Sequence, residues 1–134
     1  MKELTVKAEL SHYDELINFI NAETENTDCP IKAQTQISLA ADEILNNIMT
    51  YAYENRDIED VTVQINCTDN KIILVFIDSG MPFNPTTVKD PDITSTISER
   101  TIGGLGIYMV KKTMSQVIYE NEQGKNILTL IKDF

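Results

Sequence analysis

The segment from Ile31 to Glu54 constrains the fold more than any other part of the chain, because it contains neither glycine nor proline. Its apolar residues recur at the 3.6-residue period of an α-helix. This apolar stripe consists of Ile37, Ala41, Ile44, Leu45, Ile48 and Ala52. The segment therefore predicts a long helix over residues 31–54 with one face buried against a second layer of structure.

The other elements are predicted from an apolar period of two in strands and 3.6 in helices. Expected strands are residues 2–10, the two arms of an antiparallel hairpin over 61–77, and the arms 117–122 and 126–132 of a second hairpin. Helices are expected from Ser11, acting as N-cap, to about residue 24, and from Gly103 onward. This order favours an α+β fold, a two-layer sandwich with a mixed sheet and its helices on one face. We expect a single domain over residues 1–134.

Composition argues against several classes of function. Lys and Arg total 11 against 21 Asp and Glu, and the formal charge of −10 argues against direct binding of nucleic acid or anionic lipid. No apolar run approaches the roughly 20 residues that span a bilayer. Cys29 and Cys67 lie far apart without nearby metal ligands, and the N-terminus lacks the features of a signal peptide. We therefore expect a cytoplasmic protein that neither spans nor binds a membrane.

Two polar residues of the long helix point to chemistry at the edge of the core. Glu43 and Asn47 are one helical turn apart beside the apolar stripe, whereas Asp42 and Asn46 point away from it. A carboxylate can take a proton from an attacking hydroxyl, and an amide oxygen can bind Mg²⁺ beside phosphates. Without other signals, such a pair is more often a polar edge that has no chemical role.

A second polar feature follows six consecutive apolar residues, 72–77, in the stretch "DSGMPFNP". Asp78 at the end of a buried strand can accept a hydrogen bond from an exocyclic amine such as that of adenine. Gly80 lets the backbone approach a ligand closely, and Met81 and Phe83 can form an apolar wall. A simple turn with a solvated carboxylate is the alternative interpretation.

The third feature, "TIGGLGI", puts glycines at the start of a helix, where free N–H groups and the helix dipole favour a phosphate. Arg100, just upstream, could bind a terminal phosphate bidentately. Residues 84–102 before this helix are rich in Thr, Ser, Asp and Pro and lack periodicity, which is typical of a functional or mobile loop. A glycine-permitted turn into the helix would explain the same residues without a ligand.

In this order along the chain, the three features resemble the Bergerat-fold ATPases, the superfamily of gyrase, MutL and the histidine kinases. The stretches "EILNNIMTYAY", "DSGMPFNP" and "GGLGIYMVKKTMSQVIYE" are similar to those of the anti-sigma-factor serine/threonine kinases of bacterial partner-switching systems. The resemblance extends over nearly the whole chain, as far as "NILTLIKDF".

The resemblance implies ATP and Mg²⁺ as ligands, with Glu43 as the general base and Asn47 as the Mg²⁺ ligand. It implies that Asp78 binds adenine, with Gly80 and Phe83 beside the base, and that residues 84–102 form an ATP lid. The residues expected at the phosphates are Arg100, Gly103, Gly104, Leu105 and Gly106. The implied substrate is a Ser or Thr of an anti-anti-sigma-type antagonist protein. A sigma factor is a further expected partner, and a homodimer is the expected assembly.

Three alternatives stay open at this point. Residues 8–31 contain six acidic residues and no Lys or Arg, whereas kinases of this family usually carry an arginine in the first helix. This difference is compatible with an ATP-binding interaction module that switches partners without transferring phosphate. The ATPase half of a histidine kinase would need a phosphoacceptor histidine, and the single histidine, His12, lies at the start of a helix. An α+β domain that binds no nucleotide is the third.

Overall fold

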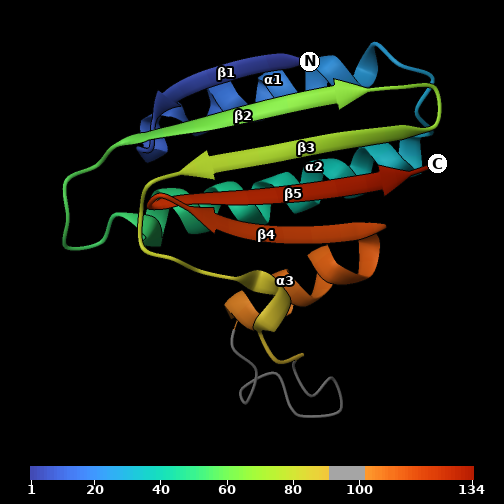
Figure 1. Ribbon diagram of the computed structural model, residues 1–134. Helices are drawn as coiled ribbons and strands as arrows, with labels where there is room; N and C mark the ends of the chain where they lie inside the picture. The colour runs from blue at the N-terminus through green and yellow to red at the C-terminus, as the bar shows by residue number, and fades with distance from the viewer. Residues whose placement is uncertain (91–101) are drawn as a thin grey trace.

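The computed structural model describes residues 1–90 and 102–134 (Figure 1). Strands are β1 (Lys2–Lys7), β2 (Asp60–Cys67), β3 (Lys71–Asp78), β4 (Gln116–Glu122) and β5 (Lys125–Asp133), and helices are α1 (Tyr13–Glu25), α2 (Ile31–Asn47) and α3 (Ile102–Thr113). Short 3-10 turns occur at Leu10–His12 and Pro85–Thr87, and a π-helical turn at Ile48–Ala52 follows α2. The predicted order of strands and helices is therefore confirmed.

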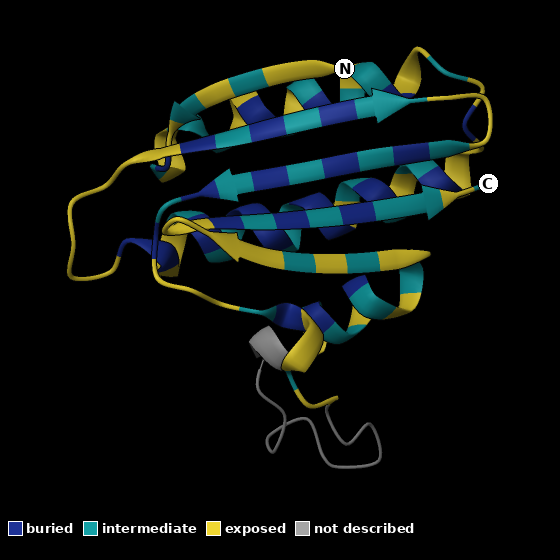
Figure 2. Cartoon of the chain, in the orientation of Figure 1, coloured by how far each residue is buried: buried dark blue, intermediate teal, exposed yellow. Residues whose placement is uncertain are grey.

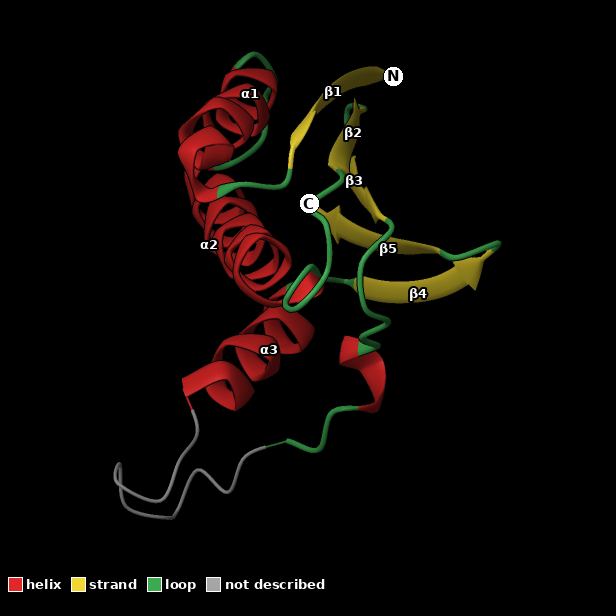
Figure 3. Ribbon diagram, turned by 90° about the vertical axis from the view of Figure 1, so that its left-hand side faces the viewer, coloured by secondary structure: helices red, strands yellow, loops and turns green. Residues whose placement is uncertain are grey.

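The five strands form one sheet in the order β1-β2-β3-β5-β4, and the helices lie on one of its faces (Figure 3). The predicted α+β sandwich is thus confirmed, but the expectation of a mixed sheet is wrong, since all four strand pairings are antiparallel. β3 and β4 run in the same direction (Figure 1). They do not pair, because the hairpin after β4 returns β5 between them.

The core lies between the sheet and the helices, and strand residues alternate between the two faces (Figure 2). On β3, Ile72, Leu74 and Phe76 point to the helices and are almost fully buried. Their neighbours on the open face are only half-buried. Each fully buried side chain of this size contributes about 1.5–3 kcal/mol through removal of apolar surface from water. All six residues of the predicted stripe, including Ile37 and Leu45, are buried as expected.

Two local predictions are wrong. Ser11 does not cap the first helix, because it lies inside the 3-10 turn and His12 occupies the N-cap without a side-chain hydrogen bond. The long helix does not continue regularly to residue 54, since α2 ends at Asn47 and the chain widens into the π-helical turn. In the described parts of the chain, no helix combines the length and apolar character that a bilayer crossing requires.

Candidate active site

A cavity of about 550 Å³ opens between the end of α2, the end of β3 and the first turns of α3. Its walls are mainly apolar, with a small number of polar groups, which is typical of sites for small ligands. It is lined by Ile44, Asn47, Ile48, Tyr51, Ala52, Asp78, Met81, Pro82, Phe83, Pro85, Val88, Ile107, Tyr119, Asn126 and Leu128.

Asp78 is the charged residue in this lining and is only 7% exposed. Its Oδ1 accepts hydrogen bonds from the backbone N–H of Gly80 at 2.8 Å and from Nδ2 of Asn126 at 2.9 Å. Within residues 1–90 and 102–134, no hydrogen bond is formed to the second oxygen, Oδ2. Burial raises the pKa of Asp78, while the two hydrogen bonds lower it. Among the described residues, one carboxylate oxygen is thus held by the protein, and the other can accept a hydrogen bond from a ligand.

Glu43 and Asn47 lie one turn apart on α2, and Nδ2 of Asn47 donates to Oε1 of Glu43 at 3.3 Å. Burial raises the pKa of Glu43, the hydrogen bond from Asn47 lowers it, and the charge of Asp42 raises it again. A carboxylate with a raised pKa is a stronger base than an exposed one. Since Asn47 donates through its nitrogen, its amide oxygen stays available for a cation.

The neighbouring polar pair of α2 is used differently. Oδ1 of Asp42 accepts hydrogen bonds from the hydroxyl of Tyr13 and, at 2.9 Å, from Nδ2 of Asn46. Burial and the bond to Asp42 together raise the pKa of Tyr13. This network ties α1 to α2, so Asp42 and Asn46 are structural neighbours of the site rather than part of the cavity.

Two glycines are required by close packing at the site. A Cβ atom on Gly80 would overlap the carbonyl oxygen and Cβ of Ala52, and the next residue, Met81, donates its N–H to that carbonyl at 2.7 Å. A Cβ atom on Gly106 would overlap the carboxyl group of Glu43. Gly80 therefore allows the close approach in which Met81 bonds the loop after β3 to the π-helical turn, and Gly106 lets α3 contact the candidate base.

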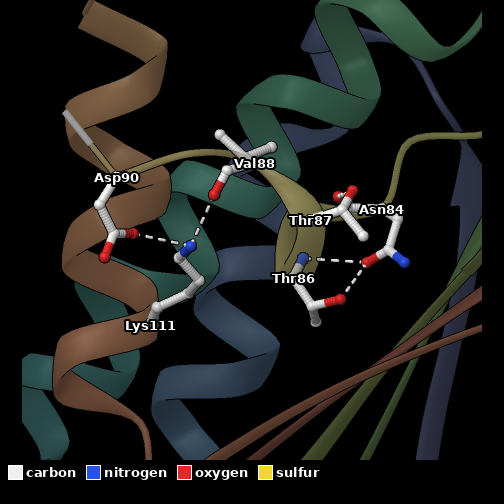
Figure 4. Close-up of polar contacts among 6 residues, drawn as sticks. All are labelled: Asn84, Thr86, Thr87, Val88, Asp90 and Lys111. Carbon is white, nitrogen blue, oxygen red and sulfur yellow. Dashed lines mark hydrogen bonds and ion pairs between the residues drawn. The ribbon is translucent and has the colours of Figure 1, made fainter.

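The segment after β3 forms one wall of the cavity and is fastened to α3 (Figure 4). Oδ1 of Asn84 accepts from the N–H and the hydroxyl of Thr86 at 2.9 and 2.6 Å, which closes the 3-10 turn. Nζ of Lys111 on α3 donates to the carbonyl of Val88 at 2.8 Å and pairs with Asp90 at 2.8 Å. The hydrogen bond from Lys111 lowers the pKa of Asp90. Residues 84–90, the first part of the loop expected over residues 84–102, are thus held by hydrogen bonds and an ion pair.

The structure brings most of the predicted site residues together. Asn47, Asp78 and Phe83 line the cavity. Glu43 and Gly80 lie beside the cavity and are hydrogen-bonded to the lining residues Asn47 and Asp78, respectively. Gly103, Gly104, Leu105 and Gly106 lie in the first turns of α3. Arg100 lies outside the described residues. The roles of these residues toward ATP and Mg²⁺ stay predictions.

Several cavity residues were missed by sequence reasoning. Asn126 and Tyr119 supply polar atoms from β5 and β4, and Ile44, Ile48 and Leu128 supply apolar walls. Asn126 did carry a signal, because it shares the inward face of β5 with Leu128 and Leu130, where an amide is unusual. Tyr119 carried no such signal in the sequence, since tyrosine is common in strands.

Comparison with known proteins gives consistent results. A serine/threonine-protein kinase, BtrW of Bordetella bronchiseptica, is 28% identical over 94 residues, which cover 70% of this chain and 66% of the relative. The serine-protein kinase RsbW of Bacillus mycoides is 24% identical over 96 residues, covering 69% of this chain and 59% of the relative. A serine-protein kinase RsbW of Staphylococcus aureus is 28% identical over 94 residues, which are 66% of this chain and 59% of that protein. The chain thus matches less than two thirds of the length of each.

The match to a family model is more extensive. Residues 6–132 match the model described as a histidine kinase-like ATPase domain. This range contains every described element that contributes to the cavity, from α2 to β5. The matched region covers almost the entire sequence, and the chain therefore belongs to the histidine kinase-like ATPase domain family.

Proposed function

We propose that this domain binds ATP with Mg²⁺ and transfers the γ-phosphoryl group to a Ser or Thr of a protein partner in the cytoplasm. The observation that carries the proposal is that Asp78 and Asn47 line one apolar cavity, with Glu43 hydrogen-bonded to Asn47 beside it. The three relatives named as serine or serine/threonine kinases support phosphoryl transfer to a hydroxyl.

We place the adenine base at the part of the cavity that Asp78 lines. An ionised carboxylate only accepts hydrogen bonds, so the free Oδ2 of Asp78 suits the exocyclic amine of adenine. Ile48, Leu128 and Phe83 offer apolar surface for the two faces of a flat base. The α- to γ-phosphates would then extend toward the N-terminus of α3, where the helix dipole and free backbone N–H groups favour negative charge.

The chemistry rests on the pair at the end of α2. Glu43 would accept the proton of the attacking hydroxyl, and its raised pKa makes it a better base for that step. The described residues hold no cluster of three or more His, Cys, Asp or Glu for a metal, which fits Mg²⁺ bound mainly by phosphates and one amide oxygen, that of Asn47. When bound, Mg²⁺ would neutralise phosphate charge, and the protein would lower the barrier further by positioning the reactants.

The partner is proposed to be a small antagonist protein of the anti-anti-sigma type, with a sigma factor as a second partner. The outer side of α1 carries exposed acidic residues, among them Asp14, Glu15 and Glu25. A partner that binds this side of the molecule would therefore present basic residues.

We also propose a homodimer formed through the open face of the sheet. An aliphatic patch there surrounds Thr129 in the strand register and consists of Ile73, Val75, Ile77, Ile118, Ile127 and Ile131. The six patch residues are uncharged, with Glu120 at their border opposite Ile127, and a two-fold axis would bring the same patch of each chain together.

Two measurements test the function. Thermal unfolding with Mg-ATP at 100 times its dissociation constant should add about 2.7 kcal/mol of stability, and an unchanged midpoint at millimolar ATP would exclude nucleotide binding. Incubation of the protein with γ-labelled Mg-ATP and a Ser-bearing antagonist protein should then transfer label to serine. If ATP stays intact beside every partner that the protein binds, the domain is a nucleotide-dependent interaction module instead.

A further inference from the structure

Asn126 is the buried amide opposite Asp78. The two residues are direct partners in the register of β3 and β5, and Asn126 is only 5% exposed. Its Nδ2 donates to Oδ1 of Asp78 at 2.9 Å and to the carbonyl of Gly80 at 3.1 Å. Since the Gly80 carbonyl can only accept a hydrogen bond, the nitrogen of the amide must face this side.

The oxygen of the Asn126 amide also has both of its lone pairs in hydrogen bonds. Its Oδ1 accepts hydrogen bonds from the hydroxyl of Tyr119 at 2.6 Å and from Nδ2 of Asn121 at 3.0 Å. Two N–H groups and two lone pairs are the entire hydrogen-bonding capacity of an asparagine side chain. Asn126 therefore has no free group for a ligand, although it lines the cavity.

We propose that Asn126, held by Tyr119 and Asn121, is a positioning residue that orients the Asp78 carboxylate so that Oδ2 is left for the base of the nucleotide. By occupying Oδ1, it prevents the carboxylate from rotating and limits ligand contact to one acceptor atom. A single fixed acceptor favours a purine with an amino group, as in ATP, over one with a carbonyl oxygen at that position, as in GTP. This inference rests on the proposed binding of ATP and concerns the residues that determine its specificity.

A purely structural role for the network makes a different prediction. Loss of a buried hydrogen bond would then lower stability and weaken ATP and GTP binding in proportion. Under our proposal, the change is selective for ATP, because only the amino group depends on the orientation of Asp78. The Michaelis constant for ATP would rise while kcat at saturating ATP stays near the wild-type value, since Asn126 is not part of the Glu43 and Asn47 pair.

The test compares Asn126→Ala and Tyr119→Phe with the control Asn66→Ala. Asn66 is a half-buried asparagine on β2 that pairs with Ile73. We expect Asn126→Ala to weaken ATP binding about tenfold or more with little change for GTP, and Tyr119→Phe to reduce the ATP-to-GTP ratio of affinities several-fold. The control Asn66→Ala should have the wild-type affinities for ATP and GTP.

The outcomes separate the inference from the function. A wild-type protein that binds neither nucleotide refutes the proposed function itself. If the wild type binds ATP and both variants keep its ATP-to-GTP ratio, the role of Asn126 is refuted and the function stands. If Asn126→Ala does not fold, Tyr119→Phe decides alone, because it removes a single hydroxyl and keeps the ring; an unchanged ratio in that variant contradicts the proposal.

Discussion

Glu43 and Gly106 are in direct contact, and the contact leaves no room for a side chain at position 106 of α3. Alanine at position 106 would force either the carboxyl group or the helix to move. Helix propensity alone predicts that Gly106→Ala stabilises α3 by about 1 kcal/mol. We instead expect at least a tenfold loss of phosphoryl transfer, measured as single-turnover transfer from labelled ATP, because the candidate base is displaced.

Met109→Ala is the matched control, since Met109 lies on the same helix and is 51% exposed. This variant should transfer phosphate at the wild-type rate. Equal activity of Gly106→Ala and wild type would show that the contact with Glu43 has no role in the reaction.

Burial raises the pKa of Glu43. The acid limb of the pH–rate profile for phosphoryl transfer should therefore lie at a higher pH than an exposed glutamate would give. The rate is expected to rise with pH as Glu43 loses its proton. The charge of Asp42 contributes to the shift, and Asp42→Asn should therefore move the limb to lower pH. Pre-steady-state transfer between pH 4 and pH 8 measures both profiles. A limb that does not move in Asp42→Asn would argue against Glu43 as the titrating group.

Replacement of Asp78 by Asn tests the adenine contact. A hydrogen bond to a charged acceptor contributes about 1.5–3 kcal/mol, so Asp78→Asn should weaken ATP binding roughly 10- to 100-fold in calorimetric titration. Its ligand-free stability at neutral pH should be equal or higher. Burial raises the folded-state pKa of Asp78, so its ionisation opposes folding once the pH exceeds the unfolded-state pKa, and asparagine removes that penalty. Wild-type ATP affinity in this variant would contradict the assignment.

The open face of the sheet gives a prediction about assembly. Val75 lies between Ile73 and Ile77 in the β3 part of the aliphatic patch, and Val75→Lys would bury a charge in the proposed interface. Light scattering after size-exclusion chromatography should show a dimer for the wild type and a monomer for this variant. Gln64→Lys is the control, because Gln64 pairs with Val75 from the edge of the patch and is already polar. A monomeric wild type, or a dimer that survives Val75→Lys, excludes this interface.

Much of the fold could be predicted because apolar periodicity reports which face of each element is buried. The alternation through Ile72, Leu74 and Phe76, for example, marks a strand against a helical layer. The π-helical turn at Ile48–Ala52 could not be predicted, since one widened turn leaves the spacing of the apolar stripe almost unchanged. The sheet was expected to be mixed because sequence does not say that β5 lies between β3 and β4.

The site was predictable where chemistry and position coincide in a short stretch. Asp78 follows an apolar strand directly, and Glu43 and Asn47 share one helix, so each stands out locally. Asn126 is distant in sequence and joins the site only through strand pairing with Asp78. The contact of Gly106 with Glu43 likewise depends on the packing of α3 against α2, which no local pattern reports.

The central claim is that Glu43 is the base of an ATP-dependent protein kinase, and Glu43→Gln tests it most directly. The amide keeps the size of the side chain and can still bond to Asn47, but it cannot accept the proton of a hydroxyl. We predict ATP affinity within about threefold of the wild type and a loss of phosphoryl transfer of about 10²-fold or more, measured on the same preparation. Transfer at the wild-type rate in Glu43→Gln would contradict the mechanism.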